Sequence, residues 1–258
     1  MHRFYAPGLA FDRAIELPLD EAHHLARVMR LKKGDAIAVF DGRGTEAAAR
    51  VEAVAGRRVT VRATAVRTPA AEPAIAITLA QALLKSDKMD RVIRDAVMLG
   101  AAAIRPFTSA RTEVPRAALE RGGRHERWHR TVISSVKQCG RAVVPPILAV
   151  QPFREVLTSV RDELCLMFVE PASEPARHSA TRTSVGRNFS CADLQTLETR
   201  VPAKATILIG PEGGWDPEEV TDAVDGGMML LTFGRRTLRA DAVGAIAIAV
   251  LQYIWKDL

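Results

Sequence analysis

The sequence contains little that would mark a secreted or membrane-spanning protein. It has three cysteines in 258 residues, and no two of them form a CxxC pair. Scattered cysteines of this kind are typical of reduced thiols, so we expect a cytoplasmic protein. The longest apolar run, from Ala242 to Leu251, is too short to cross a bilayer, and the first residues carry no apolar signal region. We therefore expect neither a membrane span nor a signal peptide.

Metal-binding and common nucleotide-binding motifs are missing as well. The adjacent His23 and His24 lack carboxylate or cysteine partners at ligand spacing. The pair His125 and His129 has helical spacing but is not interpreted as a zinc-binding HExxH helix, so we expect no metal. The chain has no GxxxxGKS/T motif, which argues against a phosphate-binding P-loop. No GxGxxG motif follows an early strand. The glycine-rich loops lie near the C-terminal end instead, unlike those of dinucleotide-binding proteins and class I methyltransferases.

The net charge of +6 is unevenly distributed along the chain. Residues 1–70 carry 12 Lys/Arg against 8 Asp/Glu, and residues 85–141 carry 13 against 6. From residue 142 onward the balance reverses to 11 against 15. A basic first half favours nucleic acid as its partner. Surplus Arg and Ala also occur in proteins of GC-rich genomes, however, so the charge alone does not show such a partner.

The first 70 residues have the pattern of a small β-rich module. Asp20 is expected to cap a short helix. The apolar positions of that helix are Ala22, Leu25, Val28 and Met29. A strand over 36–40, a hairpin turn over 41–44, and two alternating strands on either side of Gly56 follow. Short alternating strands favour a compact barrel or sandwich, and we place a polar linker at 67–73.

From residue 74 onward, strands and helices alternate. Predicted strands lie near 75–79, 102–107, 147–150 and 164–169, and predicted helices lie near 87–99, 124–139 and after Pro152. This order predicts βαβ units with a mainly parallel sheet. The polar segment 172–190 is expected to be a mobile surface loop, and we assign it no function. The last helix, over 240–255, is apolar almost all round, so it must be buried in the domain or against another subunit.

Two late loops form the candidate ligand site. The strand 207–209 is followed by Gly-Pro-Glu-Gly-Gly at 210–214, which cannot continue it, and by a capped helix beginning at Asp216-Pro217. Alone, such a loop is equally well a plain strand-to-helix connection. The second loop, 234–240, places three cations within five residues between a buried strand and a buried helix. A simple connection does not need these cations, so we expect both loops to share one site at the carboxyl ends of their strands.

Several blocks of the sequence resemble one known family. They are MHRFY, HLARVMRLKKGDAIAVFDGRG, KSDKMDRVIRDAVMLGAAAIRP, RWHRTVISSVKQCGRAVVPPI, LIGPEGGWDPEEV and LTFGRRTLRADAV. In this order and spacing they resemble the RsmE family, bacterial methyltransferases of 16S ribosomal RNA. The resemblance covers nearly the whole chain apart from about residues 172–200.

The resemblance implies a fold and a function. The fold is an N-terminal PUA-like RNA-binding β-barrel over 1–70 and a SPOUT α/β methyltransferase domain over 74–258, whose C-terminal segments form a trefoil knot. The function is transfer of a methyl group from S-adenosyl-L-methionine to N3 of a uridine in the decoding region of 16S rRNA. The partners are then the small ribosomal subunit and a second copy of the chain in a homodimer.

The resemblance also assigns site residues. The expected cofactor pocket consists of Phe168, Glu170, Ile209, Gly210, Pro211, Glu212, Gly213, Gly214, Phe233, Gly234, Leu238, Arg239 and Ala240. Our hypothesis is that Arg239 favours the uridine anion, with Glu212 or Asp241 as the proton acceptor. The basic first half separately predicts cations that bind RNA, and on the helix over 124–139 these lie on one face that could equally be merely solvated. They are Arg3, Arg27, Arg30, Lys32, Arg111, Arg127, Arg130, Lys137 and Arg141.

The chain departs from the family pattern at four places, and the last of them, Asp241-Ala242, keeps a non-catalytic function open. The family usually has Gly at Ser86, Ser at Cys139, Phe at Trp215, and Glu-Thr where this chain has Asp241-Ala242. One alternative is a non-catalytic RNA-binding or ribosome-assembly protein with a vestigial cofactor pocket. Another is a SPOUT methyltransferase that acts on a different RNA, such as tRNA.

Overall fold

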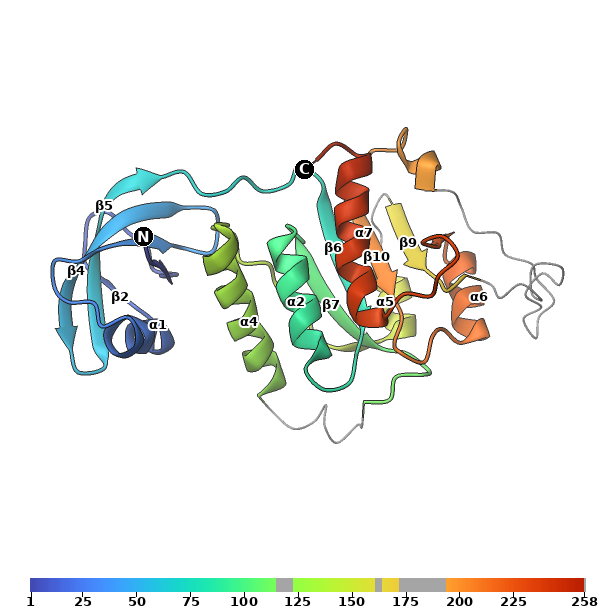
Figure 1. Ribbon diagram of the computed structural model, residues 1–258, viewed down its shortest axis with the longest axis horizontal. Helices are drawn as coiled ribbons and strands as arrows, with labels where there is room; N and C mark the ends of the chain where they lie inside the picture. Colours follow the sequence, from blue (N-terminus) through green and yellow to red (C-terminus); the bar gives the residue numbers. More distant parts are fainter. Residues whose placement is uncertain (115–122, 161–163, 172–193, 258) are drawn as a thin grey trace. The chain divides into compact units, whose positions relative to one another are not determined.

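The computed structural model describes residues 1–114, 123–160, 164–171 and 194–257 (Figure 1). It divides into two compact units. The first comprises Met1–Glu72 with Val132–Val144, and the second comprises Pro73–Thr131 with Pro145–Leu258. The segment 172–190, expected to be a surface loop, lies outside the described residues. No helix in the described part of the chain is long and apolar enough to span a membrane.

The first unit is built on a five-stranded sheet. Its strands are β1 (Arg3–Tyr5), β2 (Ile15–Glu16), β3 (Ala36–Phe40), β4 (Glu46–Ala55) and β5 (Arg58–Arg67), in the spatial order β1-β3-β4-β5-β2. Only the β1–β3 pair among them is parallel. The alternating side chains of β4 and β5 close over a core that includes Phe4, Leu25 and Ile37. The β-rich module predicted from the sequence is confirmed.

The short helix of this unit differs from the prediction. Helix α1 (Leu19–His23) begins after Pro18 and not at Asp20, and it continues as a π-helical turn, η1 (His24–Val28). Leu25 is buried as expected, but the Val28 side chain is 58% exposed. A π turn holds more residues than an α turn, so regular helical spacing misplaces the residues near its end.

The second unit is built on a six-stranded sheet in which every pairing is parallel. Its strands are β6 (Ala76–Ala82), β7 (Ala103–Thr108), β8 (Gln151–Pro152), β9 (Leu164–Phe168), β10 (Lys204–Ile209) and β11 (Met229–Leu231), in the spatial order β11-β9-β10-β6-β7-β8. The strand expected over 147–150 is reduced to a single bridge from Ile147 to Ile104 before β8. The mainly parallel sheet is otherwise as predicted, with β10 near its centre.

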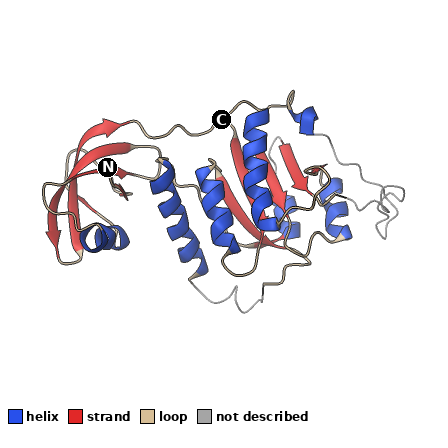
Figure 2. Ribbon diagram, viewed as in Figure 1, coloured by secondary structure: helices blue, strands red, loops and turns tan. Residues whose placement is uncertain are grey.

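Helices flank this sheet on both faces (Figures 1 and 2). Within the described ranges, the helices after α1 are α2 (Lys88–Met98), α4 (Arg124–Cys139), α5 (Phe153–Ser159), α6 (Pro217–Asp225) and α7 (Ala240–Ile254), together with the 3-10 turn η3 (Leu194–Leu197). Helix α7 packs against α2, β6 and β10, and α5 packs against α6 and β7. Gly244 permits the close approach of α7, because a Cβ there would lie 3.3 Å from both methyl groups of Leu79.

Candidate methyl-donor and RNA site

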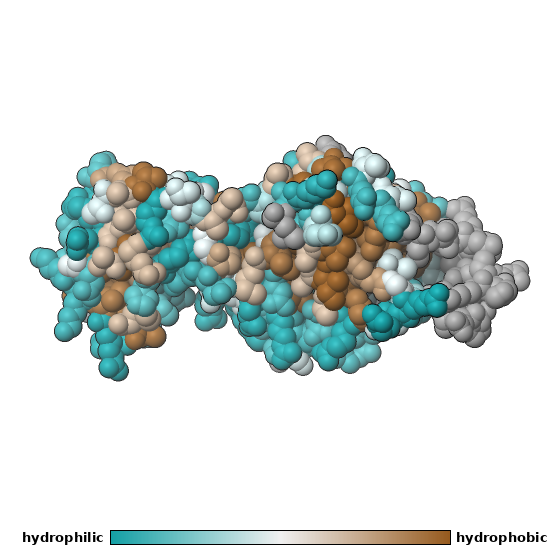
Figure 3. All heavy atoms as spheres, turned by 45° about the horizontal axis from the view of Figure 1, so that its top comes forward, coloured by the Kyte–Doolittle hydropathy of each residue, from teal (hydrophilic) through white to brown (hydrophobic). Residues whose placement is uncertain are grey.

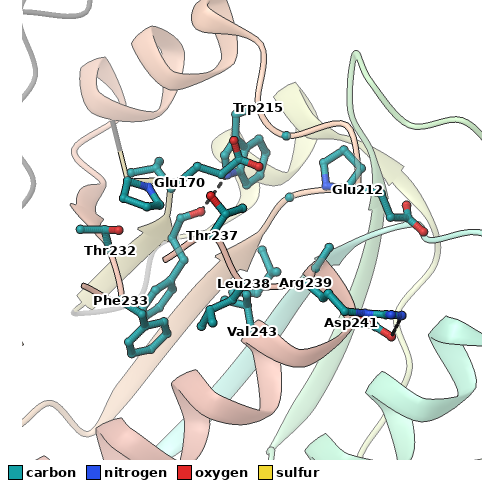
Figure 4. A pocket seen from close by; sticks show the side chains of 18 of the residues that line it. Glu170, Glu212, Trp215, Thr232, Phe233, Thr237, Leu238, Arg239, Asp241 and Val243 are labelled. Carbon is teal, nitrogen blue, oxygen red and sulfur yellow. Dashed lines mark hydrogen bonds and ion pairs between the residues drawn. The ribbon is translucent and has the colours of Figure 1, made fainter. Parts of the chain in front are cut away.

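A pocket of about 380 Å³ lies where β9, β10 and β11 end and α7 begins (Figure 4). Ligands commonly bind at this edge of open parallel sheets. Both predicted loops line it. Its lining residues are Lys88, Phe168, Val169, Glu170, Pro171, Ile209, Gly210, Pro211, Glu212, Gly214, Trp215, Thr232, Phe233, Arg236, Thr237, Leu238, Arg239, Ala240, Asp241 and Val243.

The predicted cofactor residues lie at this pocket, with two exceptions. Gly213 and Gly234 are not among the lining residues. A Cβ at Gly213 would lie 3.1 Å from Cβ of Arg111, so this glycine packs against a neighbouring loop. Gly234 has a φ of +63° and faces open space. Both glycines therefore shape the loops without touching the cavity.

Aromatic rings form one wall of the pocket. The rings of Phe168 and Phe233 stack with their centroids 4.8 Å apart. The indole Nε1 of Trp215 donates to the main-chain carbonyl of Phe168 at 2.8 Å. Gly210 lies against this indole, because a Cβ there would be 2.9 Å from Cε2 of Trp215. A residue without a side chain is thus required at Gly210 for Trp215 to sit where it does.

The helix after the glycine-rich loop begins as the sequence predicts. The Asp216 side chain accepts from the N–H of Glu218, and the Glu219 carboxylate accepts from the N–H of Asp216 at 3.1 Å. Glu219 also accepts from the N–H of Ala110 at 2.8 Å, which ties the helix start to the segment after β7. This capping box satisfies backbone donors that the first helical turn leaves free.

Four charged side chains gather at one side of the pocket. Arg239 donates to both oxygens of Asp241, each at 2.9 Å (Figure 4). Lys88 Nζ donates to Glu212 Oε1 at 2.8 Å. The three residues predicted to be catalytic are therefore brought to one pocket, and Lys88 joins them. Each cation of this group faces a carboxylate, so the group as a whole is neutral.

The carboxylates of this group are held ionised. Burial raises the pKa of Glu212, but the bonds from Lys88 and from backbone N–H groups, with the charge of Lys88, outweigh burial and leave the pKa below its usual value. The hydrogen bond from Arg239 is the largest effect on the pKa of Asp241, and it holds that pKa below its usual value against desolvation. Both groups are thus anions at neutral pH.

Several lining residues were not predicted from the sequence, among them Lys88, Trp215, Thr232 and Arg236. Lys88 lies in the KSDKMD block, where its apolar neighbours alone indicated a helix. The Thr232 hydroxyl oxygen is buried and has no hydrogen-bond partner in the described part of the protein. A buried hydroxyl at the wall of a pocket can bond a polar atom of a ligand. Only the position of Thr232 directly after a short buried strand could have indicated this role.

Six of the nine cations predicted to bind RNA are exposed. Arg27, Arg30 and Lys32 are exposed in the first unit, and Arg111, Arg127 and Arg130 are exposed in the second. Arg127 forms an ion pair with Asp90. Arg111 bonds the carbonyl of Gly213 at 3.3 Å and lies 3.6 Å from the Asp216 carboxylate.

The other three cations predicted to bind RNA, Arg3, Lys137 and Arg141, instead form contacts within the first unit. The Arg3 side chain, only 13% exposed, donates to Glu46 at 2.6 Å and to the Val136 carbonyl at 2.7 Å. Lys137 pairs with Glu21 at 2.9 Å, and the buried Arg141 donates to Glu72 at 3.0 Å. These carboxylates come from distant parts of the chain, so helix periodicity could not reveal them. Arg3, Lys137 and Arg141 therefore hold the first unit together.

No cluster of His, Cys, Asp and Glu side chains suited to a metal ion occurs in the ranges the structure describes. The cations Lys88 and Arg239 at the pocket each face a carboxylate, so they are not poised as a pair for a phosphate chain. The arrangement instead offers backbone groups, aromatic rings and the buried Thr232 hydroxyl. This donor set suits a ligand with an aromatic ring and polar substituents.

Two protein-family models match the chain. A model described as an RNA methyltransferase domain matches residues 71–252, and one described as an RNA methyltransferase PUA domain matches residues 17–64. The matched regions fall on the parallel sheet with its helices and on the five-stranded sheet, respectively.

Curated relatives named ribosomal RNA small subunit methyltransferase E match over most of the chain. The Synechocystis protein is 28% identical and covers 98% of this chain and 77% of its own length. The Bacillus subtilis protein is 27% identical, covering 91% of this chain and 88% of its own length. The Mycobacterium tuberculosis protein is 30% identical, covering 90% and 83% respectively.

Solved structures match over nearly the full chain. Ribosomal RNA small subunit methyltransferase E from Neisseria gonorrhoeae, solved with S-adenosylmethionine bound, is 32% identical with a TM-score of 0.82, and the match covers 99% of this chain and 98% of that one. A methyltransferase from Legionella pneumophila, solved with the same cofactor, is 26% identical with a TM-score of 0.86, covering 98% and 97%.

Proposed function

Because this chain belongs to the RsmE family of RNA methyltransferases, we propose that it transfers a methyl group from S-adenosylmethionine to N3 of a uridine in 16S ribosomal RNA. The observation that carries the proposal is the pocket formed by three strand ends, which joins stacked aromatic rings and a buried hydroxyl to a rim of paired charges. We expect the enzyme to act in the cytoplasm, where small ribosomal subunits are found.

The residues of the pocket fit the methyl donor. S-adenosylmethionine supplies an electrophilic methyl group on a sulfonium, and it carries no phosphate. Backbone groups of the loops after β9, β10 and β11 can grip it without a lysine. Gly210 leaves the wall open, because a Cβ there would clash with Trp215. Thr232 offers a buried hydroxyl, and the stacked Phe168 and Phe233 offer an apolar wall.

The charged rim fits the acceptor base. Methyl transfer to uridine requires loss of the N3 proton, which a nearby cation favours by stabilising the anion. Arg239 uses Nε and Nη2 to bind Asp241, and neither of those bonds uses Nη1. In this proposal Asp241 fixes the guanidinium plane, and Nη1 faces the uridine. The bidentate contact engages both oxygens of Asp241, so Glu212 is the better candidate for the proton acceptor.

The uridine must present its Watson–Crick edge to this rim. An unpaired or extruded base is therefore expected. We assign RNA backbone contacts outside the pocket to the PUA-like domain over 1–70, through the exposed Arg27, Arg30 and Lys32, and to Arg111, Arg127 and Arg130 in the domain over 74–258.

Two further features are part of the proposal. We infer that the segments forming the pocket are threaded as a trefoil knot, which family membership supports. We also infer a homodimer through α7. On this helix Tyr253 is 76% exposed, and Ile246 and Val250 are only half-buried. Figure 3 shows a hydrophobic patch on the surface over α7. Ile246→Glu should therefore give a monomer in sedimentation experiments.

One experiment separates the proposed function from its alternatives. The purified protein is given methyl-labelled S-adenosylmethionine with small ribosomal subunits that lack the modification, or with unmodified tRNA. Label in 16S rRNA alone supports the proposal. Label in tRNA alone supports a different methyltransferase. Cofactor binding by calorimetry without label in either RNA supports a non-catalytic protein.

A further inference from the structure

We propose that Lys88 is a positioning residue for methyl transfer, whose ammonium group holds the Glu212 carboxylate at the pocket rim with one oxygen directed to the substrate. This inference rests on the proposed function. Neither the family motifs nor the helix pattern of the sequence assigned Lys88 a role. The structure adds it because Lys88 lines the pocket beside three other charged residues.

Lys88 approaches Glu212 from a rigid element. It is the first residue of α2, and the following Met89 and Val92 are buried in the core. Its Nζ donates to Glu212 Oε1 at 2.8 Å, and the backbone N–H of Lys85 donates to the same oxygen at 3.2 Å. Neither bond uses Oε2. The helix start therefore fixes one carboxylate oxygen and leaves the other unengaged by either donor.

The lysine nearest in sequence is occupied elsewhere. The Lys85 side chain forms an ion pair with Glu113, on the segment after β7. Only its backbone N–H bonds Glu212. Among the described residues, the ammonium group bonded to Glu212 is thus that of Lys88.

Partial burial makes this pair stronger than an ordinary surface pair. The Lys88 and Glu212 side chains are 28% and 27% exposed. By contrast, the Arg239 side chain of the neighbouring pair is 71% exposed. Charges that are partly removed from water interact more strongly and are screened less by salt. We therefore expect the Lys88–Glu212 ion pair to be stronger and less sensitive to salt than a pair of fully exposed side chains.

The rim contains a complete set of groups for moving the uridine proton. Glu212 is faced by the Lys88 ammonium group and by the Lys85 backbone from the β6–α2 side, and its charge also reaches the Lys85 ammonium group and Arg239 before α7. Asp241 is engaged through both oxygens by Arg239. In this arrangement Arg239 stabilises the uridine anion, Oε2 of Glu212 takes the N3 proton, and Lys88 keeps Glu212 in place and ionised.

Loss of Lys88 should affect turnover more than cofactor binding. In Lys88→Met the carboxylate loses its strongest tether, and displacement of a reacting group by about 1 Å can cost on the order of 100-fold in rate. The pKa of Glu212 should also rise, because burial is then less opposed. The rate deficit should accordingly grow as the pH is lowered towards the raised pKa of Glu212, because a protonated carboxyl cannot accept the N3 proton. Lys88→Arg keeps the charge and should recover most of the rate.

The test is a double-mutant cycle measured by single-turnover methyl transfer with the full-length protein and unmodified small subunits. The variants are Lys88→Met, Glu212→Gln and the double variant. Lys204→Met is the matched control, since Lys204 is exposed at the opposite end of β10. The proposal predicts a 10- to 100-fold loss in each single variant, little further loss in the double variant, and cofactor affinity within about twofold of wild type.

Three results would overturn the proposal. One is a Lys88→Met protein as fast as wild type. A second is a loss of cofactor affinity that accounts for the whole rate change. The third is fully additive effects in the double variant, which would mean that Lys88 does not act through Glu212. If the wild-type protein itself makes no 3-methyluridine, the proposed function fails, and that result is distinguishable from all three.

Discussion

The indole Nε1 of Trp215 donates to the carbonyl oxygen of Phe168 at 2.8 Å. This bond joins the glycine-rich loop after β10 to the end of the neighbouring strand β9. A phenylalanine at this position, which the family resemblance leads us to expect, could not form such a bond. The Trp215 ring also packs against Phe107 and Phe153, with ring centroids 6.0 and 5.5 Å away. One side chain thus links the core of the domain to the wall of the pocket.

Trp215→Phe should retain the fold and lower the free energy of unfolding slightly. The aromatic packing survives, and the hydrogen bond that is removed contributes about 1 kcal/mol. Trp215 lines the pocket, whereas Trp128 and Trp255 are buried outside its lining. S-adenosylmethionine should therefore change the tryptophan fluorescence of the wild-type protein, and Trp215→Phe should lose that signal while still binding in calorimetry. An unchanged signal in the variant would place the cofactor elsewhere.

Gly210→Ala should impair cofactor binding. The added Cβ would lie 2.9 Å from the Trp215 ring, closer than real Cβ contacts allow, so either the indole or the loop must move. We expect at least a tenfold weaker affinity, equivalent to about 1.4 kcal/mol, in isothermal titration calorimetry. Gly8→Ala is the control, because a Cβ there meets no atom within 4 Å. Equal affinities for the two variants would contradict the described wall.

Substitutions of Arg239 and Asp241 should have different effects: the first on turnover, and the second on the loss of stability in acid. Arg239→Ala should sharply lower turnover and leave cofactor affinity nearly intact, since its guanidinium lies at the exposed rim. The pKa of Asp241 is lowered chiefly by the hydrogen bond from Arg239. Its contribution to stability is therefore present above its usual pKa and is lost as the pH falls through the lowered folded value.

Asp241→Asn removes that titration. Thermal melts between about pH 5 and pH 2 should consequently show a shallower loss of stability for Asp241→Asn than for wild type. A steeper loss in the variant would mean that the ion pair does not favour the ionised carboxylate. Arg239→Ala gives the internal check, because it should flatten the same profile.

The cations of the first unit should divide into structural and RNA-binding groups. Arg3→Met breaks a nearly buried pair with Glu46 and should destabilise the protein by about 3 kcal/mol. Arg27→Ala and Lys32→Ala remove exposed charges, so the melting temperature should stay unchanged. RNA affinity should instead fall, and the slope of log K against log salt should decrease by about 1 for each phosphate that the variant no longer neutralises. A stable Arg3→Met protein with weakened RNA binding would reverse this division.

Local signals in the sequence were sufficient for most of the fold. Asp216 with Pro217 and Glu219 begins α6 through contacts within four residues, and three large aliphatic residues mark β10. The π turn after α1 was not predictable in this way, because its departure from α geometry has no distinct residue pattern.

The site was predictable only where its residues are neighbours in the chain. Arg239 and Asp241 are two residues apart, at the end of the predicted loop and in the first turn of α7, and both were predicted as site residues. The contact of Lys88 with Glu212 spans 124 residues, and the contact of Arg3 with the Val136 carbonyl spans 133. Such contacts depend on how the strands are ordered in space. For this reason Lys88 was not predicted, and Arg3, Lys137 and Arg141 were expected on an exposed surface.

The most direct test of the proposed function is the identity of the modified nucleoside. Small ribosomal subunits that lack the modification are incubated with the protein and S-adenosylmethionine, and the 16S rRNA is digested and analysed by mass spectrometry. We predict 3-methyluridine at a single position, and none with Arg239→Ala within the same reaction time. Methylation of another atom or base, or none despite measurable cofactor binding, would contradict the proposed function.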